Sequence, residues 1–361
     1  MSEEEKYFTI KNHLGELYSL KSRKFGLEAK NILEYDKWKT ELRIKLKKIL
    51  GMNSMLSCAL NPQIVESEKF SEYRRDKVII QTEPGVWMPL YILTPDGIRP
   101  NEKRPCVIAP HGHGGGGKYA IVGRTDIPGV KASIEKYNYD YGLKFVMKGY
   151  VVLCSDARGS GERREAMQQG SGIEALMSTS CNNINNAAIS IGQTLTGMMT
   201  WDLMRLVDYV ETLSYCDSSK VACTGFSGGG LQALWLSALE DRITCCVVSG
   251  YFYGFKGSLL NTHLCGCNFV PRLWELIELG DLGALIAPRL LLIESGTVDS
   301  LNGEGGIQNV IEQVEITRKA YSLHNKKNNL YHHIFEGPHM WNGKKTYDFV
   351  NAWSGRGEKS C

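Results

Sequence analysis

The five residues Gly-Phe-Ser-Gly-Gly at 225–229 constrain the fold of this chain more than any other segment. A short apolar run at 221–224 precedes them, and apolar residues at helical spacing follow up to residue 239. This order predicts a strand, a sharp turn and a helix, with glycines relieving the crowding of a strained turn around Ser227. Ser227 would then stand exposed at the tip of the turn, beside the backbone N–H of Gly228. A chain with 38 glycines can carry this pattern in an ordinary loop, but the flanking strand and helix favour a nucleophile elbow.

An antiparallel hairpin is predicted earlier in the chain, from apolar runs at 78–80 and 87–93 that a Glu-Pro-Gly turn separates. After it, strand and helix patterns alternate, which is typical of a mostly parallel sheet covered by helices on both faces. An amphipathic segment at 203–213 predicts a crossover helix between two of these strands. The predicted strands of the alternating region are 106–109, 151–155, 221–224, 245–249, 290–295 and 330–335.

We predict an N-terminal helical extension at 1–70 that packs on a catalytic domain at 71–361. Up to about residue 50 the chain is charged and helical in pattern, with one apolar face. Such a lysine-rich helix can lie on a membrane, but docking through the apolar face is its usual fate. That face consists of Trp38, Leu42, Leu46 and Ile49.

Two segments inside the catalytic domain, 162–196 and 251–285, fit neither the strand nor the helix pattern. Each follows the C-terminal end of a predicted strand. Because open α/β sheets bind ligands at that edge, we expect these two insertions to form the walls and lid of a substrate pocket.

The composition of the 361 residues is that of an ordinary globular protein, with a net charge of +3 and scattered basic residues. It indicates neither a nucleic-acid partner nor insertion into a membrane. The acidic N-terminus is followed by no apolar segment that resembles a signal peptide. We therefore expect a cytoplasmic protein that acts on a small molecule, and the sequence leaves homo-oligomer formation open.

The eleven cysteines are an odd number, which favours reduced thiols over a disulfide framework. His263, Cys265 and Cys267 form one cluster with metal-ligand chemistry. A C-x-C pair with a single histidine lacks the paired spacing of a structural zinc site. We therefore predict no metal site and no cofactor. Five other cysteines lie in apolar, strand-like runs, as small core residues do: Cys106, Cys154, Cys223, Cys245 and Cys246.

A serine nucleophile needs a histidine to take its proton and a carboxylate to orient that histidine. In this architecture the order along the chain is serine, acid, histidine, each after a later strand. Asp299 follows the strand predicted at 290–295 and is our acid, although Glu294 within that strand and Glu304 farther on are alternatives. An aspartate in a turn is also common without any catalytic role.

His339 follows the last predicted strand and a Gly-Pro turn, and we predict it to be the general base. The adjacent His332 and His333 face opposite sides of a strand, which favours packing or surface roles. His263 precedes the acid and breaks the expected order. His13 and His324 lie in helical or polar contexts without a partner.

The oxyanion formed by attack on a carbonyl requires backbone N–H groups that already point at it. Gly228 supplies one donor. The second is predicted from the glycine-rich loop at 110–118, where we favour the N–H of His113 and then that of Gly114.

The same loop offers a competing interpretation, because Gly112, Gly117 and Lys118 match the spacing of a phosphate-binding loop. The segment 151–156 also resembles the acidic strand that such nucleotide hydrolases use. The match fails at the next position, which must be Ser or Thr to hold magnesium and is Tyr119 here.

From about residue 78 to 341 the chain resembles the α/β-hydrolases related to dienelactone hydrolase and to acetyl xylan esterase or cephalosporin-C deacetylase. Beyond the elbow, the residues that carry the resemblance are His-Gly at 111–112, Asp-Ala-Arg-Gly-Ser-Gly-Glu at 156–162 and Thr-Trp-Asp at 200–202. The deacetylases usually have a glutamine where this chain has Ser160 and a glutamate where it has Met340. Dienelactone hydrolases use cysteine as the nucleophile, in place of a serine.

The resemblance implies an α/β-hydrolase fold with Ser227 as nucleophile, Asp299 as acid and His339 as base. It also implies ester hydrolysis through an acyl-enzyme, with a short acyl group such as acetyl on a sugar or small metabolite. A peptidase of the same fold and a non-catalytic binding protein remain alternatives. Arg158 can contact the substrate or anchor its own loop.

Overall fold

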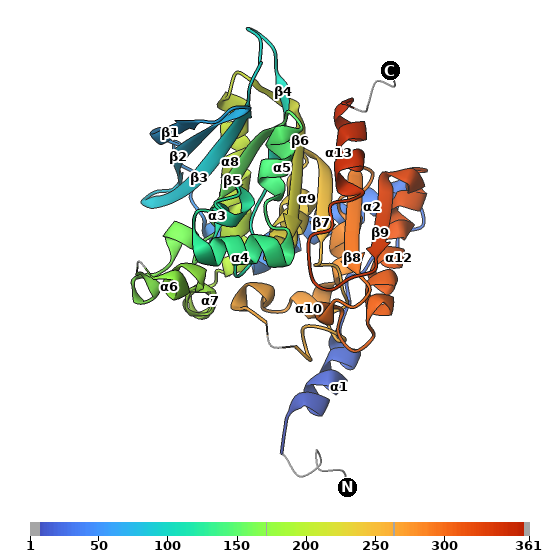
Figure 1. Ribbon diagram of the computed structural model, residues 1–361. Coiled ribbons are helices and arrows are strands. Elements are labelled where there is room, and N and C mark those ends of the chain that lie inside the picture. The colour runs from blue at the N-terminus through green and yellow to red at the C-terminus, as the bar shows by residue number, and fades with distance from the viewer. Residues whose placement is uncertain (1–7, 171, 263, 357–361) are drawn as a thin grey trace.

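A nine-stranded sheet forms the centre of the molecule (Figure 1). The computed structural model describes residues 8–170, 172–262 and 264–356. The strand order is β1-β2-β3-β5-β4-β6-β7-β8-β9, antiparallel from β1 to β5 and parallel from β5 to β9. The strands are β1 (Gln63–Lys69), β2 (Tyr73–Glu83), β3 (Val86–Pro95), β4 (Arg104–Ile108), β5 (Val151–Ser155), β6 (Cys216–Phe226), β7 (Ile243–Ser249), β8 (Leu290–Gly296) and β9 (Leu330–Phe335).

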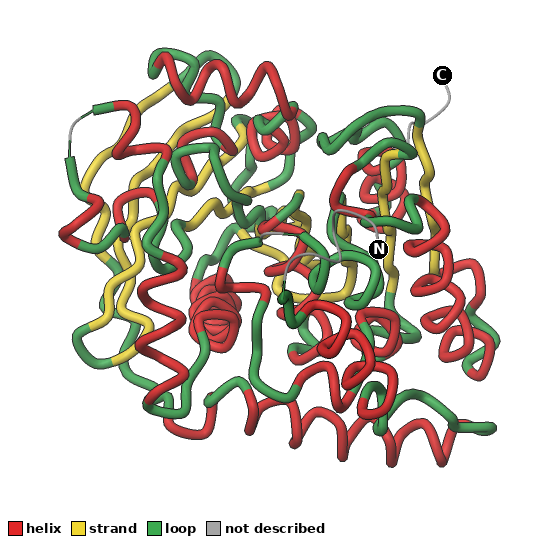
Figure 2. The backbone as a smooth tube through the Cα atoms, turned by 90° about the horizontal axis from the view of Figure 1, so that it is seen from below, coloured by secondary structure: helices red, strands yellow, loops and turns green. Residues whose placement is uncertain are grey.

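Helices cover both faces of the sheet, and Figure 2 shows the strands between them. Successive residues of the inner strands point to opposite faces, so Cys106 and Ile108 join one apolar cluster while Val107 joins the other. The first cluster includes side chains of α2 (Ile32–Ile49), α8 (Leu195–Thr212), α9 (Gly228–Leu239), α11 (Leu279–Ala284) and α12 (Ile307–Leu323). The second includes side chains of α3 (Lys118–Ile121), α4 (Pro128–Tyr137), α5 (Tyr141–Met147) and α13 (Thr346–Ser354). These features confirm the predicted fold class.

The N-terminal segment contains α1 (Lys11–Lys21), which has no buried residue, and α2, which docks on the domain. Tyr35 of α2 donates hydrogen bonds to the carbonyls of Ala284 and Ala287, at 2.8 and 3.1 Å. The buried apolar residues of α2 are Tyr35, Trp38, Leu42 and Leu46.

One strand lies inside the range 1–70 that we predicted to be helical. β1 pairs with β2 along the edge of the sheet, so the sheet begins before residue 71. All seven residues of β1 are exposed, and three of its last four are charged. A solvated edge strand of this kind shows no apolar alternation, which is why its sequence does not predict it.

The two insertions contain short helices. The first holds α6 (Ile173–Met177), α7 (Cys181–Ser190) and the start of α8, and the second holds α10 (Leu273–Leu276) and α11. Single 3-10 turns occur at Met52–Ser54, Gly161–Arg163, Ala166–Gln168, Gly266–Asn268, Ser300–Asn302 and Lys327–Asn329. Within the described residues, no helix combines the length and the apolar character needed to span a bilayer.

Candidate active site

Ser227 occupies the turn between β6 and α9 in a strained conformation, with φ 57° and ψ −122°. At two neighbouring positions, other backbone atoms approach so closely that only glycine fits. A Cβ on Gly225 would lie 2.2 Å from the Gly229 carbonyl oxygen, and one on Gly229 would lie 2.3 Å from the Pro110 carbonyl oxygen. The local geometry is therefore that of a nucleophile elbow.

The predicted acid and base lie on neighbouring loops, after β8 and β9, and are hydrogen-bonded. His339 Nδ1 is 2.7 Å from Asp299 Oδ2. The other carboxylate oxygen, Oδ1, accepts the Leu301 N–H at 2.8 Å. Asp299 is buried, whereas the His339 side chain keeps 20% of its surface exposed. The hydrogen bond thus orients the His339 imidazole, and solvent can still reach that ring.

The imidazole of His339 lies against the elbow. Its ring centroid is 4.5 Å from that of Phe226, the residue before Ser227. A Cβ on Gly250, just after β7, would lie 3.1 Å from His339 Cε1. Among the described residues, no hydrogen bond joins the Ser227 hydroxyl to the imidazole. Such catalytic bonds are often long before substrate binds, so the arrangement remains compatible with proton transfer.

The alternative acids have other partners. Glu294 is fully buried in β8, where its Oε1 accepts the Asn342 N–H at 2.8 Å and its Oε2 accepts the Gly343 N–H at 2.9 Å. This carboxylate therefore anchors the loop that follows His339. Glu304 is exposed and pairs with Lys11 at 3.7 Å.

Of the other histidines, two have partners on β8. His333 Nδ1 is 3.4 Å from Glu294 Oε2, and His332 Nε2 is 3.2 Å from Ser295 Oγ. His263 lies outside the described residues. His13 is on α1, and His324 caps the C-terminus of α12.

The glycine-rich loop after β4 packs on the elbow. A Cβ on Gly112 would lie 2.7 Å from the Phe226 carbonyl oxygen, and one on Gly228 would lie 2.8 Å from His113 Nδ1. Tyr139 donates to the His113 carbonyl at 2.7 Å, which holds the loop in place. In the described part of the chain, the backbone N–H groups of Gly228, His113 and Gly114 have no hydrogen-bond acceptor. These three groups can therefore donate to a bound oxyanion.

The two carboxylate partners of Lys118 exclude the phosphate-loop interpretation. Its buried ammonium pairs with Asp156 Oδ2 and Glu162 Oε1, both at 2.6 Å. Burial opposes the charged ammonium, but the two carboxylates outweigh it and raise the pKa of Lys118. The lysine thus ties the loop after β4 to the loop after β5, instead of facing a phosphate.

Arg158 anchors its own loop, one of the two roles that the sequence leaves open. Its Nε and Nη2 contact the Asp202 carboxylate at 2.9 and 2.8 Å, and Nη2 also donates to Glu83 at 2.7 Å. Burial opposes ionisation of Asp202, but Arg163 and Arg158 outweigh it and hold its pKa at about 2. Because its guanidinium is occupied in this way, the structure favours anchoring over contact with substrate.

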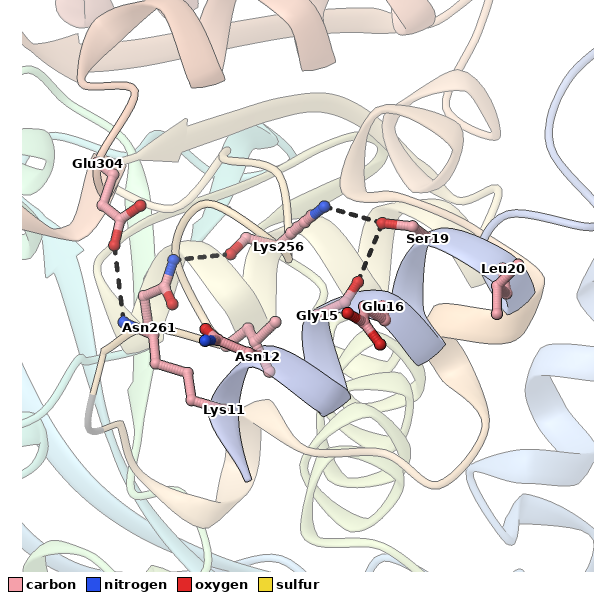
Figure 3. A pocket seen from close by; sticks show the side chains of 10 residues that line it. Lys11, Asn12, Gly15, Glu16, Ser19, Leu20, Lys256, Asn261 and Glu304 are labelled. Atoms are coloured by element: carbon pink, nitrogen blue, oxygen red, sulfur yellow. Dashed lines mark hydrogen bonds and ion pairs between the residues drawn. The ribbon is translucent and has the colours of Figure 1, made fainter. Parts of the chain in front are cut away.

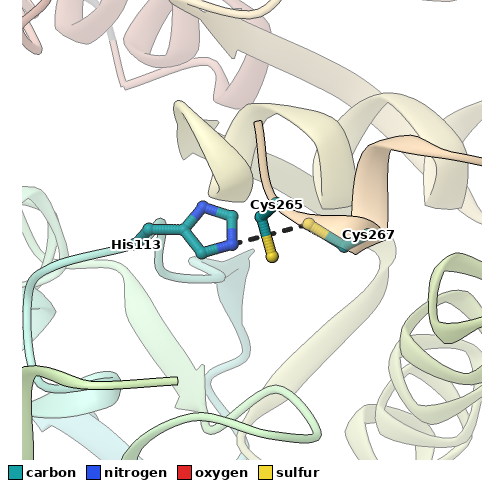
Figure 4. A group of neighbouring side chains, drawn as sticks. All are labelled: His113, Cys265 and Cys267. Carbon is teal, nitrogen blue, oxygen red and sulfur yellow. Dashed lines mark hydrogen bonds between the residues drawn. The ribbon is translucent and has the colours of Figure 1, made fainter. Parts of the chain in front are cut away.

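The side chain of His113 has neighbours that sequence reasoning missed. We predicted a role only for its backbone, yet its ring faces Cys265 and Cys267 (Figure 4). No local spacing could reveal this group, because His113 lies about 150 residues before the two cysteines in the chain.

A separate surface hollow of about 690 Å³ lies between α1 and the segment after β7 (Figure 3). Lys256 crosses it and donates to the Ser19 hydroxyl at 2.8 Å. Neither Ser227, Asp299 nor His339 lines this hollow, although Glu304, the alternative acid, does.

Comparison with known proteins identifies the family. Residues 18–255 match the model of the Abhydrolase family. The chain belongs to the Abhydrolase family. YtaP of Bacillus subtilis (strain 168), which is described as a hydrolase, is 28% identical to it over 219 residues. That match covers 58% of this chain and 65%, a little under two thirds, of YtaP.

Solved structures share the fold of this Abhydrolase family member. A protein of Bacteroides fragilis NCTC 9343 described as an acetyl xylan esterase has a TM-score of 0.72 and 18% identity, covering 92% of this chain and 83% of that one. A glucuronoyl esterase from Solibacter usitatus has a TM-score of 0.64 and 16% identity, covering 92% and 97%. These similarities confirm the α/β-hydrolase fold.

Proposed function

We propose that this chain is a serine carboxylic-ester hydrolase that works through an acyl-enzyme. Ser227 gives its hydroxyl proton to His339 Nε2 and attacks the ester carbonyl, and the departing alcohol then takes that proton. Water activated by the same imidazole releases the acid and restores the serine. The reaction so written uses side chains and backbone N–H groups alone.

The hydrogen bond of 2.7 Å between His339 Nδ1 and Asp299 is the observation that carries this proposal. A carboxylate at Nδ1 keeps the proton on that nitrogen, which leaves Nε2 free to accept the proton of a serine. The strained turn at Ser227 and the His339–Asp299 pair follow three parallel strands, β6, β8 and β9, at the same edge of the sheet. Backbone strain of this kind persists where function requires it, which supports the role of Ser227 as nucleophile.

Stabilisation of the oxyanion is assigned in this proposal to the N–H of Gly228 together with that of His113 or Gly114. The support is the close packing of their loop against the elbow, since oxyanion donors must be held in place before the reaction.

We further propose a short acyl group, acetyl first, on a sugar or a small metabolite as the substrate. The support is similarity of fold to proteins described as an acetyl xylan esterase and a glucuronoyl esterase. A serine peptidase and a non-catalytic binding protein are the two alternatives, because this fold serves several functions.

Labelling with a fluorophosphonate probe tests the nucleophile. We expect the wild-type protein to be labelled, Ser227→Ala to lose labelling, and Ser218→Ala, at an exposed position, to keep it. Labelling of Ser227→Ala would show that another residue is the nucleophile. An unlabelled wild-type protein would favour the binding protein.

A substrate panel separates the enzymatic alternatives. Nitrophenyl esters of increasing acyl length, acetylated sugars and matched amides are compared by kcat/KM. We expect the acetyl esters to be hydrolysed fastest. Preference for the amides would support a peptidase.

A further inference from the structure

Three potential metal ligands from two segments meet beside the predicted oxyanion loop. One ring nitrogen of His113 and the Sγ atoms of Cys265 and Cys267 all lie within 4.8 Å of one another (Figure 4). Cys267 is fully buried, and the other two are half-buried. His113 belongs to the loop after β4, whereas the cysteines flank Gly266 in the second insertion.

The spacing of these atoms fits a tetrahedral zinc ion. With Zn–S bonds of about 2.3 Å and a Zn–N bond of about 2.05 Å, the sulfur and nitrogen at two corners of a tetrahedron lie about 3.5 Å apart. The observed distance from Cys267 Sγ to His113 Nε2 is 3.5 Å. These two side chains therefore require little movement to bind one ion.

Helix α7 of the first insertion is held against the C-x-C segment, because Asn182 accepts the Gly266 N–H at 2.6 Å. Two thiols and one imidazole supply three ligands of a tetrahedral zinc ion and leave its fourth position to solvent.

A polar group beside the cluster can support one of the sulfur atoms, as the outer partners of metal ligands do. Asn268 Nδ2 lies 3.7 Å from Cys267 Sγ, where it can donate to a metal-bound thiolate.

We propose that His113, Cys265 and Cys267 form a binding site for a thiophilic divalent cation, with zinc as the expected ion. Binding releases the thiol protons to solvent and joins two segments, the loop after β4 and the C-x-C segment. Because a Cβ on Gly228 would lie 2.8 Å from His113 Nδ1, the ion would sit one imidazole ring away from the elbow. It would thus hold the second insertion against the predicted oxyanion loop without contacting the reacting atoms.

This site does not depend on the proposed esterase activity, since it uses none of Ser227, Asp299 and His339. Sequence analysis predicts no metal because it pairs Cys265 and Cys267 only with their neighbour His263. The structure brings in His113 instead, from about 150 residues away in the chain.

Metal content and cobalt spectroscopy test the proposal on the whole protein, purified with a reductant. We expect about one zinc per chain by elemental analysis, and thiolate-to-cobalt charge-transfer bands when Co²⁺ replaces zinc. Cys265→Ser combined with Cys267→Ser should lose both signals. Cys58→Ser, at a half-buried cysteine outside the cluster, should keep both.

Further measurements separate loss of the ion from loss of the fold. Ser227→Ala should bind the ion like the wild type. Circular dichroism checks that each variant is folded, and chelation of the ion should lower the Tm of the wild type. A wild-type protein with neither zinc nor cobalt bands would overturn the proposal, as would a disulfide within the cluster under reducing conditions.

Discussion

Replacing Asp299 with asparagine should impair the reaction by changing the tautomer of His339. In the wild type, Oδ1 accepts the Leu301 N–H while Oδ2 faces His339 Nδ1. An asparagine can satisfy Leu301 only with its oxygen, which turns its NH₂ group toward Nδ1. The imidazole must then accept at Nδ1 and carry its proton on Nε2, where it cannot take the proton of Ser227.

The expected loss of kcat is about 10⁴-fold, the size of effect that the wrong tautomer has in serine hydrolases. It corresponds to about 5 kcal/mol of transition-state stabilisation. KM should change little, because Asp299 is buried behind the imidazole and does not face the substrate. Folding should also be retained, since asparagine has nearly the size of aspartate and satisfies the Leu301 N–H.

Hydrolysis of nitrophenyl acetate measures this effect, with Tm as the check on folding. Asp217→Asn provides a matched control at a partly exposed aspartate on β6. If folded Asp299→Asn keeps more than a tenth of the wild-type kcat, Asp299 does not set the tautomer and the acid must be sought elsewhere.

Three further perturbations test the framework around the site. Gly229→Ala should cost about 1–3 kcal/mol or more and abolish probe labelling, because its Cβ would lie 2.3 Å from the Pro110 carbonyl oxygen. Lys118→Met should lower the free energy of unfolding in urea by about 3–5 kcal/mol, since it leaves the buried Asp156 without its cation. Burial, followed by Arg318, lowers the pKa of His332 to about 4, so protonation below its unfolded value of about 6.5 favours the unfolded chain. Stability should therefore fall as pH drops from 6.5 to 4, by at most about 1.4 kcal/mol per pH unit, and His332→Gln should flatten this slope in urea titrations.

Each of these perturbations has a control at an unconstrained position. Among the described residues, the Cβ of Gly172→Ala meets no atom within 4 Å, so this variant should preserve labelling. Lys131→Met removes an exposed pair with Glu135, which is expected to change stability by less than about 1 kcal/mol. His13→Gln, at an exposed histidine, should leave the pH slope unchanged. Equal effects in a control and its test variant would contradict the assigned contact.

The parts of the fold that the sequence predicts are those with strong local patterns. β5 and β9 have the predicted bounds, and α9 ends at the predicted residue 239. β5 is an apolar run that begins and ends abruptly, and the elbow combines such a run with glycines. In contrast, α7 has the sequence CNNINNAAIS, whose asparagines favour turns, so packing against the C-x-C segment decides its helical state.

The parts of the site that the sequence does not predict depend on contacts across the chain. The order of serine, acid and histidine suffices to propose Asp299 and His339, because loops after parallel strands meet at one edge. Nothing local indicates that Lys118 turns inward to Asp156, or that the His113 ring turns toward cysteines of the second insertion. Side-chain direction in glycine-rich loops is set by partners that arrive from elsewhere.

The contacts of strand β8 decide which segments must be exchanged together when this site is transferred between proteins. It ends just before Asp299, and its buried Glu294 accepts the N–H groups of Asn342 and Gly343 on the loop that follows His339. Strand β8 thus leads into the loop of the predicted acid and also restrains the backbone next to the predicted base. A chimera that exchanges residues 290–302 with a relative should keep its acid and base aligned only if residues 336–346 are exchanged as well.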